Sequence, residues 1–230
     1  MAVFAKEPAP GQVKTRLAPP LSNQQAADLY REMLADVLAE TARAAERFGF
    51  AAFLVVHPPD ALGEMLANAP AGFAGLSQRG PDLGARLAAA IGELFQAGYG
   101  PVLVRGSDSP GVSADALGQA IQGLTAADVV IAPDRDGGYH LLGSNRLVPG
   151  LFDRPMSQPR VFDGTVDHAR SQGCRVAILE PGYDVDTVED LARLRAPDSQ
   201  PQAGRSVAFA TREDLWRFLP GRAAHSSRSD

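Results

Sequence analysis

The chain lacks the features that mark secreted, membrane and nucleic-acid-binding proteins. It has one cysteine, Cys174, in 230 residues, so no intramolecular disulfide can form and a reducing compartment is expected. Its longest apolar run, residues 48–56, contains a glycine and is far too short to cross a bilayer. Lysines and arginines form no cluster interleaved with aromatic residues. We therefore expect a cytoplasmic protein that has neither a membrane nor a nucleic acid as its partner.

Positive charge is concentrated near the N-terminus, although the formal net charge of the whole chain is −5. Lys6, Lys14 and Arg16 lie on a loop rich in proline and glycine that follows a short apolar segment. Such a loop, placed between a strand and a helix, can bind phosphate through cations and backbone N–H groups. A Walker loop is excluded because Val13, and not glycine, precedes Lys14. The loop therefore predicts a phosphate site of another kind, with a solvated basic loop as the alternative.

Apolar runs typical of strands alternate with amphipathic stretches, a pattern that predicts βαβ units and a mostly parallel sheet. The predicted strands cover residues 3–5, 53–56, 76–78, 101–105, 129–132, 139–143 and 176–179. The predicted helices cover residues 23–48, 61–69, 83–97, 114–124 and 160–172, and another begins at the Thr187 capping box.

The composition changes after residue 195. We predict one domain over residues 1–195, followed over 196–230 by a linker, a short amphipathic segment and a polar tail. The amphipathic segment, residues 207–219, contains Trp216 and is predicted to form a short helix. We expect this helix to pack on the core of the same chain, with docking on a partner as the alternative.

Two acidic motifs follow predicted strands, and ligands of parallel sheets gather at the carboxyl ends of strands. Asp108 lies in the segment Gly106-Ser-Asp-Ser-Pro110 and is a candidate ligand of Mg²⁺, which prefers oxygen donors. Asp186 is a candidate second ligand, and Asp184 is expected either to support it or to serve as an anion at the start of the next helix. The plain alternative for the first motif is a turn. The pattern Asp-x-Asp-x-Thr also occurs around the nucleophile of haloacid-dehalogenase phosphatases, but there it follows the first strand.

Two further segments are candidates for nucleotide contacts. Gly137 and Gly138 form a turn without side-chain bulk, which would let a flat or sugar-like ligand approach the backbone. Gln78 and Asp82 could read the base or the ribose, with Arg86 facing phosphate. The alternatives are an ordinary hairpin turn and a helix cap followed by a surface arginine.

Together, five motifs resemble those of a bacterial family of unassigned function in the nucleotide-diphospho-sugar transferase superfamily, usually described as GT-A type glycosyltransferases. They occur in the order of that family and cover residues 1–195: Phe4 to Leu17, Asp82 to Arg86, Gly106 to Pro110, Asp136 to Tyr139 and Asp184 to Thr187. The layout is also similar to that of molybdenum-cofactor nucleotidyltransferases and phospholactate guanylyltransferase. The resemblance implies a three-layer α/β/α Rossmann-like GT-A fold with a mostly parallel mixed sheet.

The resemblance also implies roles for individual residues. The nucleotide-binding candidates on the first loop are Lys6, Gly11, Lys14 and Arg16. The metal-ligand candidates are Asp108 and Asp186, which would hold Mg²⁺ or Mn²⁺, and the catalytic candidates are Lys14, Arg16 and Asp108. The sequence departs from the family pattern at His140, where an aromatic or aliphatic residue is expected, and at Met156-Ser-Gln-Pro.

The cationic loop favours one reaction over another. A nucleoside triphosphate donor expels pyrophosphate, which calls for several cations, whereas a metal alone can largely offset the charge of a departing nucleoside diphosphate. The sequence therefore favours transfer of a nucleotidyl group to a small phosphorylated or anionic acceptor. A glycosyltransferase that uses an NDP-sugar is the alternative, and a non-catalytic nucleotide-binding protein is a further one. Whether the chain forms a homo-oligomer is left open.

Overall fold

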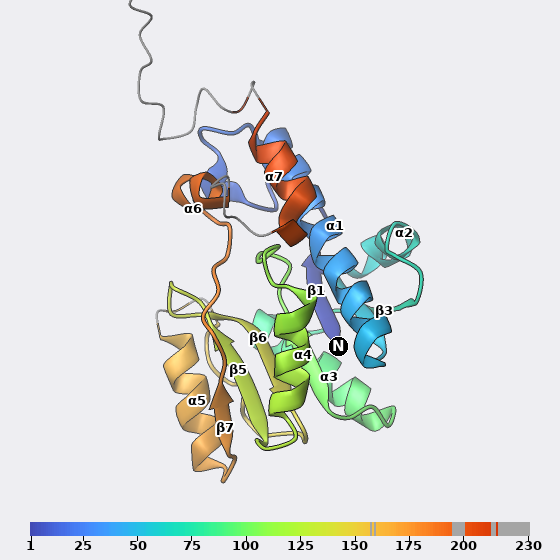
Figure 1. The fold of residues 1–230 in the computed structure, drawn as a ribbon, viewed down its shortest axis with the longest axis vertical. Helices are drawn as coiled ribbons and strands as arrows, with labels where there is room; N and C mark the ends of the chain where they lie inside the picture. Colours follow the sequence, from blue (N-terminus) through green and yellow to red (C-terminus); the bar gives the residue numbers. More distant parts are fainter. Residues whose placement is uncertain (157, 159, 195–200, 213–214, 216–230) are drawn as a thin grey trace, which may run out of the picture.

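A seven-stranded mixed sheet forms the centre of the computed structural model, which describes residues 1–156, 158, 160–194, 201–212 and 215 (Figure 1). The strands are β1 (Ala2–Lys6), β2 (Ala52–His57), β3 (Phe73–Ser77), β4 (Val102–Arg105), β5 (Val129–Pro133), β6 (Tyr139–Ser144) and β7 (Val176–Ile178). Their order is β3-β2-β1-β4-β6-β5-β7, and within the described chain only β6 runs antiparallel to its neighbours.

Helices cover both faces of this sheet. They are α1 (Asn23–Phe48), α2 (Leu62–Ala67), α3 (Leu83–Gln96), α4 (Ala114–Gly123), α5 (Val161–Ser171), α6 (Val188–Leu194) and α7 (Gly204–Ala210), with 3₁₀ turns η1 (Thr15–Leu17), η2 (Pro59–Ala61) and η3 (Pro201–Ala203). The buried side chains of α1, α2 and α4 pack on one face, and those of α3 and α5 on the other. The predicted three-layer α/β/α fold with a mostly parallel sheet is therefore confirmed.

The central strands are buried on both faces, as expected for a sheet covered by helices. On β1, Val3 and Ala5 point toward α1, while Ala2 and Phe4 belong to the core under α3. This alternation explains why such a short apolar segment suffices for the strand. Most predicted elements agree with the structure to within one to three residues; the helix predicted over residues 61–69 corresponds to α2, which is shorter and follows the 3₁₀ turn η2.

Helix α1 begins and ends where its capping residues predict. The Ser22 hydroxyl accepts a hydrogen bond from the Gln25 backbone N–H, and the Gln25 side chain accepts one from the Ser22 N–H, which is a capping box. At the other end, Gly49 adopts a left-handed conformation with a φ of 70°. The resulting 26-residue helix contacts both the sheet and the C-terminal helix α7.

Helix α7 lies beside α1 (Figure 1). The Asp36 carboxylate on α1 accepts hydrogen bonds from the backbone N–H groups of Arg205 and Ser206, at 3.2 and 2.8 Å. This contact anchors the first turn of the helix, which begins at Gly204, before the predicted start at residue 207, and ends at Ala210; of the predicted residues 213–219, only 215 is among the described ones. Its described part packs on the core of its own chain, whereas Trp216 lies outside the described residues. The division at residue 195 stays a prediction.

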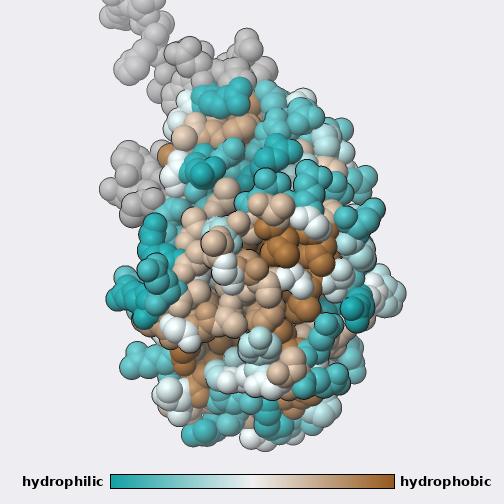
Figure 2. Space-filling model, turned by 90° about the vertical axis from the view of Figure 1, so that its right-hand side faces the viewer, coloured by the Kyte–Doolittle hydropathy of each residue, from teal (hydrophilic) through white to brown (hydrophobic). Residues whose placement is uncertain are grey.

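Hydrophobic residues gather in the middle of the face seen in Figure 2, and hydrophilic residues surround them. Among the described helices, none combines the length and the apolar character needed to cross a membrane. The 26-residue α1 carries acidic and basic residues along its length.

The carboxyl ends of all the parallel strands lie at one edge of the sheet. Strand β1 pairs in parallel with β2 and β4, and β5 pairs in parallel with β7. The antiparallel β6 lies between β4 and β5, so both of these also run in one direction. The loops after β1, β4, β5 and β7 therefore meet at this edge, and these loops carry the acidic and basic motifs found in the sequence.

Candidate active site

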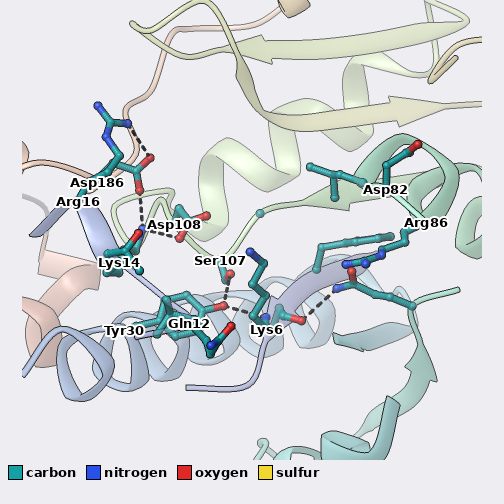
Figure 3. A pocket seen from close by; sticks show the side chains of 17 residues that line it. Lys6, Gln12, Lys14, Arg16, Tyr30, Asp82, Arg86, Ser107, Asp108 and Asp186 are labelled. Atoms are coloured by element: carbon teal, nitrogen blue, oxygen red, sulfur yellow. Dashed lines mark hydrogen bonds and ion pairs between the residues drawn. The ribbon is translucent and has the colours of Figure 1, made fainter. Parts of the chain in front are cut away.

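A pocket of about 500 Å³ lies at the carboxyl edge of the sheet, between the loops that follow β1, β3 and β4. Eight of the predicted site residues line it: Lys6, Lys14, Arg16, Gln78, Asp82, Arg86, Asp108 and Asp186. Figure 3 shows Lys14 and Arg16 on one side, Asp82 and Arg86 on the other, and Lys6 between them. Residues far apart in the sequence thus converge on one pocket whose lining carries several cations.

Lys14 connects the two acidic motifs. Its ammonium group contacts Asp108 and lies 2.8 Å from Oδ1 of Asp186 (Figure 3). The Lys14 side chain is 3% exposed, whereas those of Asp108 and Asp186 are 41% and 35% exposed. Arg16 approaches the other oxygen of Asp186 at 3.6 Å and is itself 67% exposed. A buried cation therefore holds together two carboxylates that remain accessible from the pocket.

Electrostatics keep Lys14 charged despite its burial. Desolvation works against the charged form, but the nearby carboxylates of Asp108 and Asp186 more than compensate and raise the pKa of Lys14. The group is therefore an ammonium ion at neutral pH, positioned to neutralise negative charge in the pocket.

Local packing explains the position of Lys14. Val13, directly before it, is buried against Ala27 and Tyr30 of α1. Leu17 and Leu21, which follow, are buried against residues of α1 and α6. Between these anchors, Lys14 adopts a left-handed conformation with φ 49° and ψ 36°, which aims its side chain at the acidic residues. Val13, which stands where a Walker loop would have glycine, thus anchors this loop by its hydrophobic packing.

Tyr30 and Ser107 belong to the site but were missed by the sequence analysis. The Tyr30 hydroxyl accepts the backbone N–H of Lys6 at 3.0 Å and is hydrogen-bonded to the Ser107 hydroxyl at 2.7 Å. Burial, followed by the charge of Asp108, raises the pKa of Tyr30 to about 12. This tyrosine ties the loops after β1 and β4 to α1. Its position in the helical apolar pattern gave it the appearance of an ordinary core residue.

The residues on the opposite side of the pocket make structural contacts as well. Gln78 is buried and donates both amide hydrogens to backbone carbonyls, those of Ala5 and Val55, at 3.0 and 2.9 Å. Asp82 caps α3 by accepting the Ala85 N–H at 2.8 Å, which was the structural alternative for this residue. Arg86 donates to the carbonyl of Gly80 at 3.0 Å. The structural contacts occupy the Gln78 amide N–H groups and one Asp82 oxygen. Contacts of Gln78 and Asp82 with a base or a ribose stay predictions.

The three predicted glycines lie outside the lining of this pocket. Gly11 has a φ of 76° and shapes the loop before Lys14. Gly137 has a φ of 90°, which favours glycine, and a Cβ there would make a tight contact of 3.0 Å with the backbone nitrogen of Arg160. Gly138 lines an adjoining cavity. The glycine turn therefore shapes the region next to the pocket, with no part in its walls.

The loop after β4 is held rigidly by buried polar contacts. Arg105 is buried and donates to the Thr41 hydroxyl and to the Ser109 carbonyl, both at 3.2 Å; burial lowers the pKa of Arg105 to about 10. The Ser109 hydroxyl donates to Asp184 at 2.5 Å. Burial, followed by the charges of Asp134 and Asp108, raises the pKa of Asp184 to about 8. Asp184 thus contacts the loop after β4 through Ser109, whereas its predicted support of Asp186 stays a prediction.

The carboxylate pair fits a magnesium ion that arrives with phosphate. Asp108 and Asp186 both reach one ammonium nitrogen, so a small cation could contact both. In the described part of the chain, no group of three or more histidine, cysteine, aspartate or glutamate side chains is arranged as a metal site. Mg²⁺ is commonly bound by one or two carboxylates together with substrate phosphates and water. The donor set therefore suits a nucleotide-bound metal better than a permanently bound one.

Comparison with known proteins assigns the family. The family model DUF2064, described as an uncharacterized protein conserved in bacteria, matches residues 37–158. The chain belongs to this family. A crystal structure from Desulfovibrio desulfuricans G20, provisionally named a nucleotide-diphospho-sugar transferase, is 32% identical with a TM-score of 0.80; the match covers 91% of this chain and 95% of that one.

Two more distant proteins are also similar. The 2-phospho-L-lactate guanylyltransferase of Methanothermobacter thermautotrophicus is 29% identical over 185 residues, which are 79% of this chain and 78% of that protein. The 4-diphosphocytidyl-2C-methyl-D-erythritol synthase of Anaerococcus prevotii DSM 20548 shares the fold, with 12% identity, a TM-score of 0.55 and coverage of 92% and 96%. The DUF2064 protein therefore has the nucleotide-diphospho-sugar transferase fold predicted from its motifs, and these likenesses make it a transferase.

Proposed function

We propose that the protein is a Mg²⁺-dependent nucleotidyltransferase, which moves the nucleotidyl group of a nucleoside triphosphate to a small phosphorylated or anionic acceptor and releases pyrophosphate. The observation that carries the proposal is the meeting of Lys14 with Asp108 and Asp186 in a pocket that also contains Lys6, Arg16 and Arg86. The likeness to a protein named as a guanylyltransferase supports the same reaction.

The side chains suit the charges of this reaction. The triphosphate would lie along the loop after β1, where Lys14 and Lys6 neutralise its oxygens and Arg16 reaches the end that departs as pyrophosphate. Mg²⁺, when bound by Asp108 and Asp186, would offset the remaining phosphate charge and keep the reacting groups in line. Because Tyr30 fixes the loops after β1 and β4 relative to each other, the cations are in place before the nucleotide arrives.

One observation favours a second candidate function. The relative with 32% identity and a TM-score of 0.80 is named for transfer from nucleotide-diphospho-sugars. The same pocket and carboxylate pair would then bind an NDP-sugar and release a nucleoside diphosphate. The two reactions differ in their leaving group, so the products distinguish them.

The test is to incubate the protein with Mg²⁺, a donor and a panel of small acceptors. The donors are the four ribonucleoside triphosphates and common NDP-sugars; the acceptors are phosphorylated acids such as 2-phospho-L-lactate and 3-phosphoglycerate, and the hydroxy acids lactate and glycerate. Pyrophosphate released only with acceptor supports nucleotidyl transfer, whereas nucleoside diphosphate released from an NDP-sugar supports the alternative. Release of neither product would contradict both.

Donor binding can be measured separately by thermal shift. A ligand at 100 times its Kd adds about 2.7 kcal/mol to the free energy of unfolding, or roughly 5 to 11 °C for a domain of this size. The proposal requires that nucleoside triphosphates raise the Tm more with Mg²⁺ than without it. A shift that is the same with and without the metal would contradict the role of Asp108 and Asp186.

A further inference from the structure

A second cavity, of about 220 Å³, adjoins the nucleotide pocket. The two share Phe4, Leu83, Gly106 and Asp108 in their walls. A molecule in the smaller cavity would therefore lie next to the candidate metal ligand Asp108 and the phosphates held there. Its titratable and charged lining groups are Asp108, Asp136, Asp184, Arg105, Tyr139 and His140.

His140 forms a buried pair with an aspartate beside this cavity. The turn between β5 and β6 places Asp134 against His140, and Oδ1 of Asp134 lies 2.8 Å from Nδ1 of the imidazole. Their side chains are 2% and 6% exposed. The second oxygen of Asp134 is buried and has no hydrogen-bond partner among the described residues. A carboxylate in this position orients the ring and selects the tautomer with its proton on Nδ1, which leaves the lone pair on Nε2.

Glycine at position 182 allows the ring to lie there. A Cβ on Gly182 would be 2.5 Å from Cε1 of His140, so any larger residue would displace the imidazole. The Gly182 N–H donates to the Pro133 carbonyl at 2.9 Å, which fixes this segment beside the end of β5. Within the part of the chain that the structure describes, Nε2 of His140 has no hydrogen-bond partner. His140 is thus a base that Asp134 orients. It lines the cavity, and its Nε2 is unpaired among the described residues.

We propose that His140 is the general base of the transfer reaction, that Asp134 positions it, and that the acceptor attacks through a hydroxyl group. This inference rests on the proposed nucleotidyl transfer. Nε2 takes the proton of the acceptor hydroxyl as the oxygen forms a bond to the α-phosphorus; the bond from that phosphorus to the departing pyrophosphate breaks, and pyrophosphate leaves with the bonding electron pair.

The lining of the cavity favours a hydroxyl over a phosphate as the attacking group. Asp108 and Asp136 line the cavity, and a phosphate there would meet like charges; the guanidinium of Arg105, which also lines it, already donates to Thr41 and Ser109. An ionised phosphate also needs no base, whereas a hydroxyl gains typically 100-fold or more from one. A histidine held by a carboxylate therefore matches an alcohol acceptor.

The experiment compares the wild-type protein with H140Q and H140A, using GTP, Mg²⁺ and the acceptors lactate, glycerate, 2-phospho-L-lactate and 3-phosphoglycerate. We expect the wild type to use a hydroxy acid, and H140Q to lose about 100-fold in kcat with that acceptor while the KM for GTP stays unchanged. Added imidazole should restore part of the rate of H140A. Wild-type kcat in H140Q, no rescue by imidazole, or use of the phosphate acceptors only through their phosphates would each overturn the proposal.

A spectroscopic measurement keeps the inference testable if the variants do not fold or if the proposed reaction fails. In ¹⁵N spectra of the wild type, with the His140 signals assigned as those that remain in each of the variants H57Q, H168Q and H225Q, we expect a protonated Nδ1 and an unprotonated Nε2. A protonated Nε2 would overturn the role of His140 whatever reaction the protein catalyses. Absence of transfer with all donors and acceptors, together with the expected tautomer, would instead refute the proposed nucleotidyl transfer.

Discussion

Replacing Lys14 with methionine should have opposite effects on metal binding and on catalysis. The ammonium group contacts Asp108 and Asp186, the same carboxylates that are proposed to hold Mg²⁺. Without nucleotide, Lys14 and the metal therefore compete for two negative charges. With nucleotide bound, Lys14 instead helps to neutralise the phosphates, so its loss should slow the reaction.

The magnitudes follow from exposure and charge. A cation at contact distance is worth about 1 kcal/mol to a carboxylate in water and about 4 kcal/mol near a protein surface. Because the carboxylates of Asp108 and Asp186 are 41% and 35% exposed, the lower value of about 1 kcal/mol applies. Lys14→Met should therefore bind Mg²⁺ about fivefold more tightly in the absence of nucleotide. Loss of one preorganised cation should lower kcat/KM by about 3 kcal/mol, or roughly 150-fold.

Calorimetric titration with Mg²⁺ and steady-state kinetics with the productive substrate pair measure the two effects. Lys6→Met is the matched control, because Lys6 lines the same pocket but has no ion pair among the described residues. It should weaken nucleotide binding and leave the affinity for metal alone unchanged. Weaker or equal Mg²⁺ binding by Lys14→Met would refute the competition, and an unchanged kcat/KM would refute the catalytic role.

Three further predictions concern single residues. Asp108→Asn should lower Mg²⁺-dependent turnover about 100-fold or more, whereas Asp115→Asn on α4 should not. Gly84→Ala should lower the free energy of unfolding by about 1–3 kcal/mol, since its Cβ would lie 2.3 Å from the Phe152 carbonyl oxygen, whereas Gly92→Ala, with open space around it, should be neutral or stabilising; equal Tm values would contradict this. For Asp184, whose pKa of about 8 exceeds the ordinary 3.8, the folded state binds more protons between pH 4 and 8, so stability falls as pH rises. The Tm of Asp184→Asn minus the Tm of the wild type should therefore increase from pH 5 to pH 8. A difference in Tm that does not change with pH would refute this.

Much of the fold follows from local patterns in the sequence. The bounds of α1 depend on a capping box at Ser22 and a left-handed glycine at position 49, and both signals lie within a few residues of the helix they delimit. The apolar strands are recognisable for the same reason, since a fully covered parallel sheet requires continuous apolar runs. The helix predicted to begin at residue 207 begins at Gly204, because its first turn is fixed by Asp36, about 170 residues away.

By itself, the sequence determined the order of strands and helices, the cationic loop after β1, and the acidic motifs after β4 and β7, because each depends on neighbouring residues. Only the tertiary structure decided that Lys14, and not Lys6, lies between Asp108 and Asp186, across 172 positions of chain. It also decided that the Gln78 amide donates to the backbone, that Tyr30 ties two loops together, and that Asp134 orients His140. These choices arise from packing between distant segments, because a side chain can reach a partner only after the sheet has brought their loops to one edge.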